Sequence, residues 1–375
     1  MHNVMMEEKV LKLDKSNWVP TKLGELATEI SKRVDNPSES EYDRFVSLRC
    51  FVSGNIKIKT WEPTENLASS AKAFESGDIL FARRNAYLRR ASMVDFNGCC
   101  SGDAFVLREN HDKVVPGYLA FLLNSNALWD YANSNAAGTM SKRVKWRDLA
   151  EYEFLLPPKD LQAKLAELLW AMDEVVEREN DILDKNINLR KSQLKETYFT
   201  IPIKHRSEKV ILEKLIKLSS GKTRPKDLRD KPIDNYVYPV YGGNGIIGYS
   251  KDYLIEYDTI VLGRVGEYCG VVHDTSGKIW VSDNALYVKE YLSSIDKYYL
   301  SRFLEYIDLN KQQNKSSHPL ITQSKVCSNS IPMLSKELML KQNLKLNGIE
   351  ELILNLKTKI SSSKELQKSL INQVF

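Results

Sequence analysis

The chain repeats part of its own sequence, and this repeat constrains its fold more than any other feature. Residues 101–107 read SGDAFVL and residues 282–288 read SDNALYV, each with a polar triplet, a small residue and an apolar run. Every residue of the second stretch lies 181 positions after its counterpart, and the same offset relates Arg83 to Arg264, Ile79 to Ile260, Tyr87 to Tyr268, Glu109 to Glu290 and Tyr118 to Tyr299. So many matches at one offset indicate an internal duplication.

The two copies share one order of expected elements and differ in the lengths of their loops. The offset becomes 192 between Leu23 and Leu215 and about 176 between Pro158 and Leu334. In each copy a short helical or turn segment precedes β-like runs, which are followed by a short helix, a polar loop and an apolar exit. This pattern predicts an α+β fold with two similar modules of mostly antiparallel strands, whose unlike loops suit different targets.

A long amphipathic segment follows each module. The first carries apolar residues three and four apart, with polar residues on the same seam: Leu161, Leu165, Leu168, Met172, Val175, Glu179, Ile182, Asn186 and Leu189. The second carries Ile349, Ile353, Leu356, Ile360, Ser363, Gln367, Leu370 and Val374, with Gly348 as a possible weak point. Segments of roughly 40 residues predict helices on the order of 60 Å long.

Such a helix cannot bury its apolar stripe alone, so we expect the two helices to pair as an antiparallel coiled coil that separates the modules. The alternative is that each helix packs on its own module or on another chain. The predicted division is a first module over residues 1–158, a spacer helix over 159–200, a second module over 201–334 and a C-terminal spacer helix over 335–375.

Composition excludes several classes of protein and site. With 42% apolar and 27% charged residues, the chain is neither disordered nor membrane-embedded. No apolar run approaches the roughly 20 residues of a spanning helix, and the N-terminal stretch is too charged for a signal peptide, so we expect a cytoplasmic protein without a membrane. The five cysteines form no CxxC pair and the five histidines are scattered, so no metal site is predicted and the thiols are expected to be buried or incidental.

Basic residues gather in a few loops, although the net charge of the chain is only +5. FARRNAYLRR and TMSKRVKWR belong to the first copy, and GKTRPKDLR and NKQQNKSSHPLITQSK belong to the second. Arginine and lysine bind phosphates, and arginine also reads guanine, so these loops predict contacts with double-stranded DNA; a solvated surface is the alternative. The candidate DNA-binding residues are Arg83, Arg84, Arg89, Arg90, Lys142, Arg143, Lys145, Lys222, Arg224, Arg264, Lys315 and Lys325.

Motifs for catalysis or for a bound cofactor are not found. The sequence contains no Walker A loop, no Gly-x-Ser-x-Gly elbow and no Asn-Pro-Pro-aromatic tetrad for methylation of an amine. GGNGIIG matches GxGxxG at Gly243, Gly245 and Gly248, but the residues after it are too few and too polar for the packed helix of a dinucleotide site. We therefore interpret it as a loop that turns tightly or lets a backbone approach closely, and we predict no catalytic, cofactor-binding or metal-binding residues.

The arrangement from Trp18 to Phe375 resembles the specificity subunits of type I restriction-modification systems. The sharpest local matches are WVPTKLGELA, SGDILFARRNAYLRRASMVDFNGCCSGDAFVL, GTMSKRVKWRDLAEYEFLLPPKDLQ, YPVYGGNGIIGY and TIVLGRVGEYCGVV. The resemblance implies two target-recognition domains, each reading one half of a bipartite asymmetric DNA site. It also implies two methyltransferase (modification) subunits that bring S-adenosylmethionine, and motor-nuclease subunits that use ATP and Mg²⁺. The resemblance does not predict which DNA sequence is recognised or how many base pairs separate the two half-sites.

One departure and three alternatives accompany this resemblance. Gln162 follows PPKDL in the first copy, as is frequent in the family, whereas SIPMLSKELML in the second copy has no glutamine there, which implies a less symmetric surface for partners. The alternatives are an enzyme with unrecognised motifs, a coiled-coil scaffold that joins proteins without touching DNA, and the recognition subunit of a related bifunctional restriction system.

Overall fold

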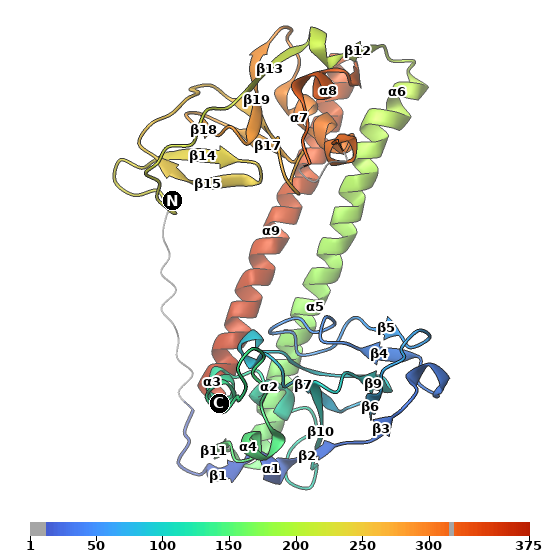
Figure 1. Ribbon diagram of the computed structural model, residues 1–375, viewed down its shortest axis with the longest axis vertical. Helices are drawn as coiled ribbons and strands as arrows, with labels where there is room; N and C mark the ends of the chain where they lie inside the picture. Colours follow the sequence, from blue (N-terminus) through green and yellow to red (C-terminus); the bar gives the residue numbers. More distant parts are fainter. Residues whose placement is uncertain (1–12, 315–318) are drawn as a thin grey trace. The chain divides into compact units, whose positions relative to one another are not determined.

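The computed structural model describes residues 13–314 and 319–375, which form two compact units. Among the described residues, the first unit comprises 13–181 and 356–375, and the second comprises 182–314 and 319–355. Two long helices, α5 (Lys159–Lys195) and α9 (Lys336–Val374), each contribute residues to both units (Figure 1). Each unit therefore holds one copy of the repeat together with a part of each long helix.

The first unit contains two larger sheets and one two-stranded sheet. The four-stranded antiparallel sheet has the order β2 (Ala27–Ile30), β10 (Ala104–Glu109), β7 (Ile79–Ala82), β8 (Ala91–Met93). The five-stranded sheet has the order β3 (Arg33–Val34), β6 (Ala71–Phe74), β9 (Gly98–Cys100), β4 (Arg44–Val46), β5 (Glu62–Pro63), and β1 (Val19–Lys22) pairs with β11 (Glu153–Leu156). The short helices are α1 (Leu23–Leu26), α2 (Leu119–Leu122), α3 (Asn126–Ser134) and α4 (Trp146–Leu149).

The second unit is built in the same way, with a smaller second sheet. Its four-stranded antiparallel sheet has the order β13 (Ile216–Ser220), β19 (Ala285–Tyr291), β16 (Thr259–Gly263), β17 (Val272–Thr275). The three-stranded sheet has the order β15 (Gly245–Ser250), β14 (Tyr238–Gly242), β18 (Trp280–Val281), and β12 (Lys209–Ile211) pairs with β20 (Ser330–Pro332). The helices are α6 (Ile201–Lys204), α7 (Lys297–Tyr306) and α8 (Gln323–Cys327).

Strand register confirms the duplication residue by residue. Ala82 pairs with Ala104 in the first unit, and Gly263 pairs with Ala285 in the second. Each residue of the second pair lies 181 positions after its counterpart in the first. The neighbouring ladder repeats as well, because Ile79 pairs with Met93 and Ile260 pairs with Asp274. The predicted α+β fold with two similar modules is therefore confirmed.

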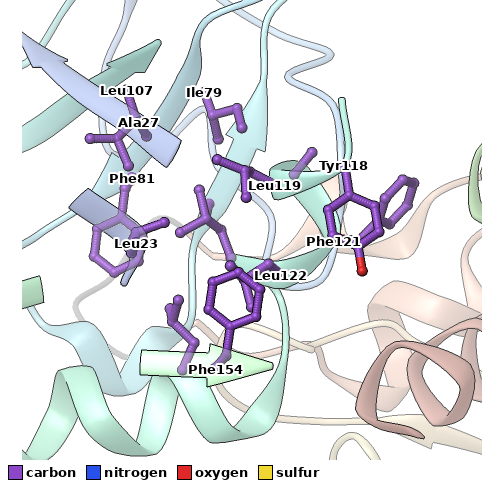
Figure 2. Close-up of a cluster of buried hydrophobic side chains, with 14 of the residues drawn as sticks. Leu23, Ala27, Ile79, Phe81, Leu107, Tyr118, Leu119, Phe121, Leu122 and Phe154 are labelled. Atoms are coloured by element: carbon purple, nitrogen blue, oxygen red, sulfur yellow. The ribbon is translucent and has the colours of Figure 1, made fainter. Parts of the chain in front are cut away.

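In each unit the four-stranded sheet is buried on both faces. Successive residues point to opposite faces of a strand, so Ile79 and Phe81 enter one apolar cluster while Leu80 enters another. The first cluster lies between the sheet and the helices, where Leu119 and Leu122 pack, as Figure 2 shows. The second unit repeats this alternation with Ile260 and Leu262 on one face and Val261 on the other.

Within each unit the long helices run antiparallel, as predicted. In the first unit the Oγ of Ser363 donates to Glu179 at 3.0 Å, and the Nε2 of Gln367 donates to the Leu169 carbonyl at 3.4 Å. Residues later in α9 thus contact residues earlier in α5, as they do in an antiparallel pair. The second unit shows the same direction, with Arg190 bound to Glu350 at 2.7 Å and Gln193 bound to Gln342 at 2.7 Å.

The predicted seam of α9 is confirmed, whereas that of α5 is confirmed only in part. Leu165 and Glu179 of the predicted α5 seam are buried. Leu168, Val175, Ile182 and Leu189 are each 45–51% exposed. Other buried residues lie one position after a predicted seam residue and include Leu169, Val176 and two polar residues, Gln162 and Asp173. The predicted seam of α5 therefore mixes buried positions with positions of an exposed apolar stripe.

Gln162 has a local role in the first unit. Its Nε2 donates to the Pro157 carbonyl at 2.8 Å, and its Oε1 accepts from the Val115 amide at 3.0 Å. Because the side chain is buried, it fixes the entry into α5 from inside the unit. The absence of a counterpart in the second copy is thus a difference in the core, and the inference about a less symmetric partner surface stays a prediction.

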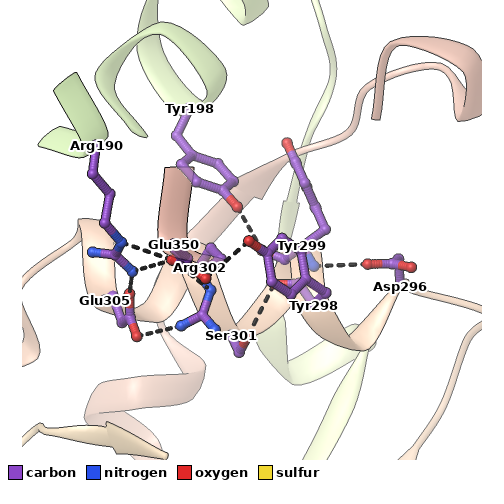
Figure 3. Close-up of polar contacts among 9 residues, drawn as sticks. All are labelled: Arg190, Tyr198, Asp296, Tyr298, Tyr299, Ser301, Arg302, Glu305 and Glu350. Carbon is purple, nitrogen blue, oxygen red and sulfur yellow. Dashed lines mark hydrogen bonds and ion pairs between the residues drawn. The ribbon is translucent and has the colours of Figure 1, made fainter. Parts of the chain in front are cut away.

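A cluster of partly buried ions joins three helices of the second unit. Arg190 on α5 forms ion pairs with Glu305 on α7 and Glu350 on α9, as Figure 3 shows. Arg302 on α7 contacts the same two carboxylates, and the hydroxyl of Tyr298 donates to Glu350 at 3.0 Å. Both arginines therefore hold α9 against α5 and α7.

Candidate nucleic-acid interface

The arginine that follows β7 is fixed by its backbone. The amide of Arg83 donates to the Asp103 carbonyl at 3.0 Å, and its own carbonyl accepts from the Val144 amide at 3.0 Å. These bonds bring the loop before β10 and the loop before α4 to the end of β7. The second copy repeats both bonds at 3.0 Å with Arg264, Asn284 and Ile321.

Asp103 joins two of the predicted arginines in the first unit. Its carboxylate accepts from the Nε of Arg143 at 2.8 Å and lies 3.5 Å from the Nη1 of Arg84. The hydrogen bond from Arg143 is the main reason that the pKa of Asp103 lies below its usual range. The Nε of Arg84 also donates to the Ser141 hydroxyl at 2.7 Å. Two guanidinium groups around one carboxylate leave an excess positive charge, and both arginines remain about two-fifths exposed.

Arg83 contributes through an aromatic contact. Its guanidinium carbon lies 5.1 Å from the centre of the Phe105 ring, within the range of a cation–π interaction. Among the described residues, its Nε has no hydrogen-bond partner. Phe105 in turn meets Trp146 of α4 edge to face at 6.1 Å. The side chain of Arg83 is thus positioned by the ring beneath it.

The lysines of the polar loop lie beside this cluster and are exposed. The amide of Asn85 donates to the Lys142 carbonyl at 2.9 Å, which ties the loop to the turn after β7. Lys142 and Lys145 are exposed. The structure therefore brings together Arg83, Arg84, Lys142 and Arg143, with Lys145 next to them.

Arg89 and Arg90 have other surroundings. Arg89 donates to Asn126 at 2.6 Å and pairs with Asp130 at 2.8 Å, beside a cavity of about 290 Å³ that α9 also lines. Arg90 donates to the Leu48 carbonyl at 2.8 Å, and burial lowers its pKa. These bonds give both arginines roles inside the first unit, and their contact with DNA stays a prediction.

The second copy surrounds its arginine with neutral groups. The Nη1 of Arg264 donates to the Ser220 hydroxyl at 3.3 Å, and the Nε2 of Gln323 donates to the same oxygen at 3.3 Å. Both line a cavity of about 290 Å³ together with Leu286 and Thr322. Where the first copy has Asp103, the second has Asn284, so the acidic partner is absent from that position.

The remaining predicted residues of the second copy are mostly exposed. Lys222 and Arg224 follow β13, and the Lys222 amide donates to the Val281 carbonyl at 3.0 Å. Lys325 lies on α8, two residues after Gln323. Lys315 lies outside the described residues. The predicted residues do not include Asp103, Ser220 or Gln323, because the clustering of basic charge gives no signal for an acidic or a neutral side chain.

The GxGxxG stretch forms a β-hairpin and not a strand followed by a helix. Gly242 at the end of β14 pairs with Gly245 at the start of β15, which has a φ of +105°. The Gly243 carbonyl lies so close to Gly263 that a Cβ there would collide with it. The interpretation as a turn with close backbone approach is confirmed, and the geometry of a dinucleotide-binding turn is not present.

Metal sites and membrane spans are considered for the described residues, 13–314 and 319–375. In these ranges no group of three or more His, Cys, Asp or Glu residues could hold a metal ion. None of the helices described there combines the length and hydropathy that a membrane span needs. Four of the cysteines are buried and Cys327 is partly buried, so the thiols fit the predicted packing role.

Comparison with protein families identifies the two copies. A family model described as the type I restriction modification DNA specificity domain matches residues 15–185 and 204–360. The chain belongs to this family. The specificity-subunit resemblance of the sequence is thereby confirmed, and each match covers one copy of the repeat and a part of a long helix.

Individual members of the specificity family are similar over parts of the chain. The specificity subunit of the type I restriction enzyme EcoprrI from Escherichia coli is 28% identical over 109 residues, which are 29% of this chain and 27% of that protein. The EcoDI specificity subunit, also from Escherichia coli, is 24% identical over 138 residues, or 36% and 30% of the two chains. These alignments span less than a third of either relative.

Solved structures of the same kind share the fold over nearly the whole chain. The S subunit of a type I restriction-modification system from M. genitalium has a TM-score of 0.65 at 16% identity, covering 97% of this chain and 98% of that one. A chain from a study of complex assembly and conformational transition in a type I system has a TM-score of 0.57 at 19% identity, covering 96% and 98%. At these identities the similarity shows the fold.

Proposed function

We propose that the chain is the non-catalytic DNA-recognition subunit of a type I restriction-modification complex, with each copy contacting one half of a bipartite asymmetric site. The observation that carries this proposal is the arginine held at one backbone position in both copies, Arg83 and Arg264. Arginine can bind a phosphate or take guanine O6 and N7 together. Membership of a DNA specificity family supports the proposal.

The asymmetry of the proposed site follows from the unlike surroundings of the two arginines. Arg83 lies beside Asp103, which binds two further arginines, whereas Arg264 shares the Ser220 hydroxyl with Gln323. Different donors and acceptors fit different base edges in the major groove. The two copies share the backbone bonds at this arginine but surround it with different side chains, and they therefore suit two different half-sites.

Methyl transfer and DNA cleavage are assigned in this proposal to partner subunits. Two methyltransferase subunits would bring S-adenosylmethionine, and motor-nuclease subunits that use ATP and Mg²⁺ would join them in the cytoplasm. Support for docking comes from α5, where exposed apolar side chains recur every seven residues. They are Leu168 and Val175 in the first unit, and Ile182 and Leu189 in the second.

Sequencing of methylated bases tests the proposed function. Cells that carry this chain with its modification subunit are expected to methylate a split motif of two short half-sites, because each copy reads one of them. The motif should disappear when the chain is deleted and the modification subunit is kept. A continuous motif would favour a related bifunctional system, and no motif despite an active modification subunit would favour a protein scaffold.

Substitution of the basic loop in the first copy should weaken electrostatic binding. With Lys142→Gln and Lys145→Gln together, we expect lower DNA affinity of the assembled complex. The slope of log affinity against log salt should be less steep by up to about 1.8, at roughly 0.9 per lost phosphate contact. Fluorescence anisotropy over a salt series measures this slope. Lys113→Gln is the matched control, since this exposed lysine lies outside the basic loops and pairs with Glu25 at 3.8 Å; an equal change there would contradict the assignment.

A further inference from the structure

The geometry points to Arg264 and Gln323 as a base-reading pair for the half-site of the second copy. This inference rests on the DNA-recognition function proposed above and adds the residues and the class of base. The class is a purine, read in the major groove through its N7 edge.

The pair converges on one hydroxyl group from separate elements. Arg264 follows β16, Gln323 begins α8, and Ser220 ends β13. The Ser220 oxygen accepts from both side chains at 3.3 Å, so the guanidinium and the amide lie side by side. The cavity of about 290 Å³ at this point has Leu286 as an apolar wall and Thr322 and Ser324 at its edge.

Both side chains keep the groups that base recognition needs. Among the described residues, no carboxylate forms an ion pair with Arg264, whose hydrogen bond to Ser220 uses one of five N–H donors. Gln323 is exposed, and its amide retains a second N–H and a carbonyl oxygen. Arginine binds guanine through O6 and N7, and glutamine binds adenine through N6 and N7. The shared requirement of both pairings is a purine N7.

The backbone around the pair is held in place before DNA binds. The Arg264 amide and carbonyl are bonded to Asn284 and Ile321, each at 3.0 Å. Thr322 caps α8, because its hydroxyl accepts from the Lys325 amide at 3.2 Å. Side chains on fixed backbone lose less freedom on binding, which favours selective recognition.

The first copy lacks an equivalent pair. Val144 and Ile321 occupy the same place, because each donates to the carbonyl of its arginine. Two residues later the first copy has Trp146, which meets Phe105, and the second copy has Gln323. The amide next to the arginine is thus confined to the second copy, and substitution there should change one half-site alone.

The test compares three variants of the complete complex by sequencing of methylated bases. For Gln323→Ala and for Arg264→Ala we expect relaxed recognition at one or two positions of one half-site, with discrimination lowered roughly 10- to 100-fold. The letters of the other half-site should not change. Lys325→Ala is the matched control on α8, because loss of a phosphate contact should weaken methylation uniformly and leave every letter in place.

Failure of the base-reading pair and failure of the proposed DNA-recognition function give different results. Wild-type discrimination at both half-sites in Gln323→Ala and Arg264→Ala would overturn the pair, as would relaxation of both half-sites together. A wild-type complex without a split motif would instead contradict the proposed function. Circular dichroism of each variant checks folding, and a folded variant is expected because Gln323 is exposed.

Discussion

Replacing Trp129 with alanine is expected to destabilise the protein by about 3–5 kcal/mol, the range for removing a large buried aromatic residue. Trp129 on α3 is 1% exposed, and its ring stacks on Phe81 of β7 with centroids 4.5 Å apart and planes 14° apart. The substitution removes this contact and leaves a cavity between α3 and the four-stranded sheet. Thermal or urea unfolding of the full chain measures the loss.

Tyr87→Ala is the control for this substitution. Tyr87 belongs to the same unit and is 67% exposed, so its removal should change stability by less than about 0.5 kcal/mol. Phe81 precedes Arg83 by two residues, and disturbed packing beneath β7 should therefore also lower DNA binding through the first copy. Equal losses of stability in the two variants would contradict this prediction, since they would mean that the neighbouring side chains fill the space left by Trp129.

The fold was predictable because duplication leaves a signal that does not depend on knowing the fold. A constant offset of 181 residues means that no residue is inserted between β7 and β10 in one copy relative to the other. The same pairing register then follows for Ala82 with Ala104 and for Gly263 with Ala285. Apolar periodicity was less informative for α5, because that helix has two apolar stripes and periodicity does not say which one is covered. The buried positions also include Asp173, which the predicted seam left out and whose partner Lys57 lies far away in the chain.

The candidate site was only partly predictable, since the direction of a side chain depends on the backbone. Arg84 and Arg90 are close in sequence, but Asn85 and Arg89 adopt left-handed φ values of 55° and 48° on either side of a short 3-10 turn. This turn sends Arg89 towards Asn126 and leaves Arg84 beside Asp103. The charged run therefore divides into separate surroundings that its sequence does not reveal.

Replacing Arg190 with leucine is expected to destabilise the protein by about 2–3 kcal/mol. Arg190 is the one residue of α5 in the ion cluster of Figure 3, and its loss leaves Glu305 and Glu350 with a single shared arginine, Arg302. Removing one partner of a buried ion pair costs about 3–5 kcal/mol because the other charge stays desolvated. We expect a smaller value here, since these carboxylates are 20–24% exposed.

Arg178→Leu separates this effect from the general loss of a positive charge on α5. Arg178 pairs with Glu174 at 3.0 Å across one helical turn, and its side chain is 74% exposed. Exposed pairs of this kind contribute about 0.3–0.5 kcal/mol, so the control should unfold almost like the parent chain. Urea unfolding of both variants at low and high salt completes the test. The Arg190 effect should persist at high salt, because partly buried charges are screened much less than exposed ones, and its disappearance would show that solvent already shields the cluster.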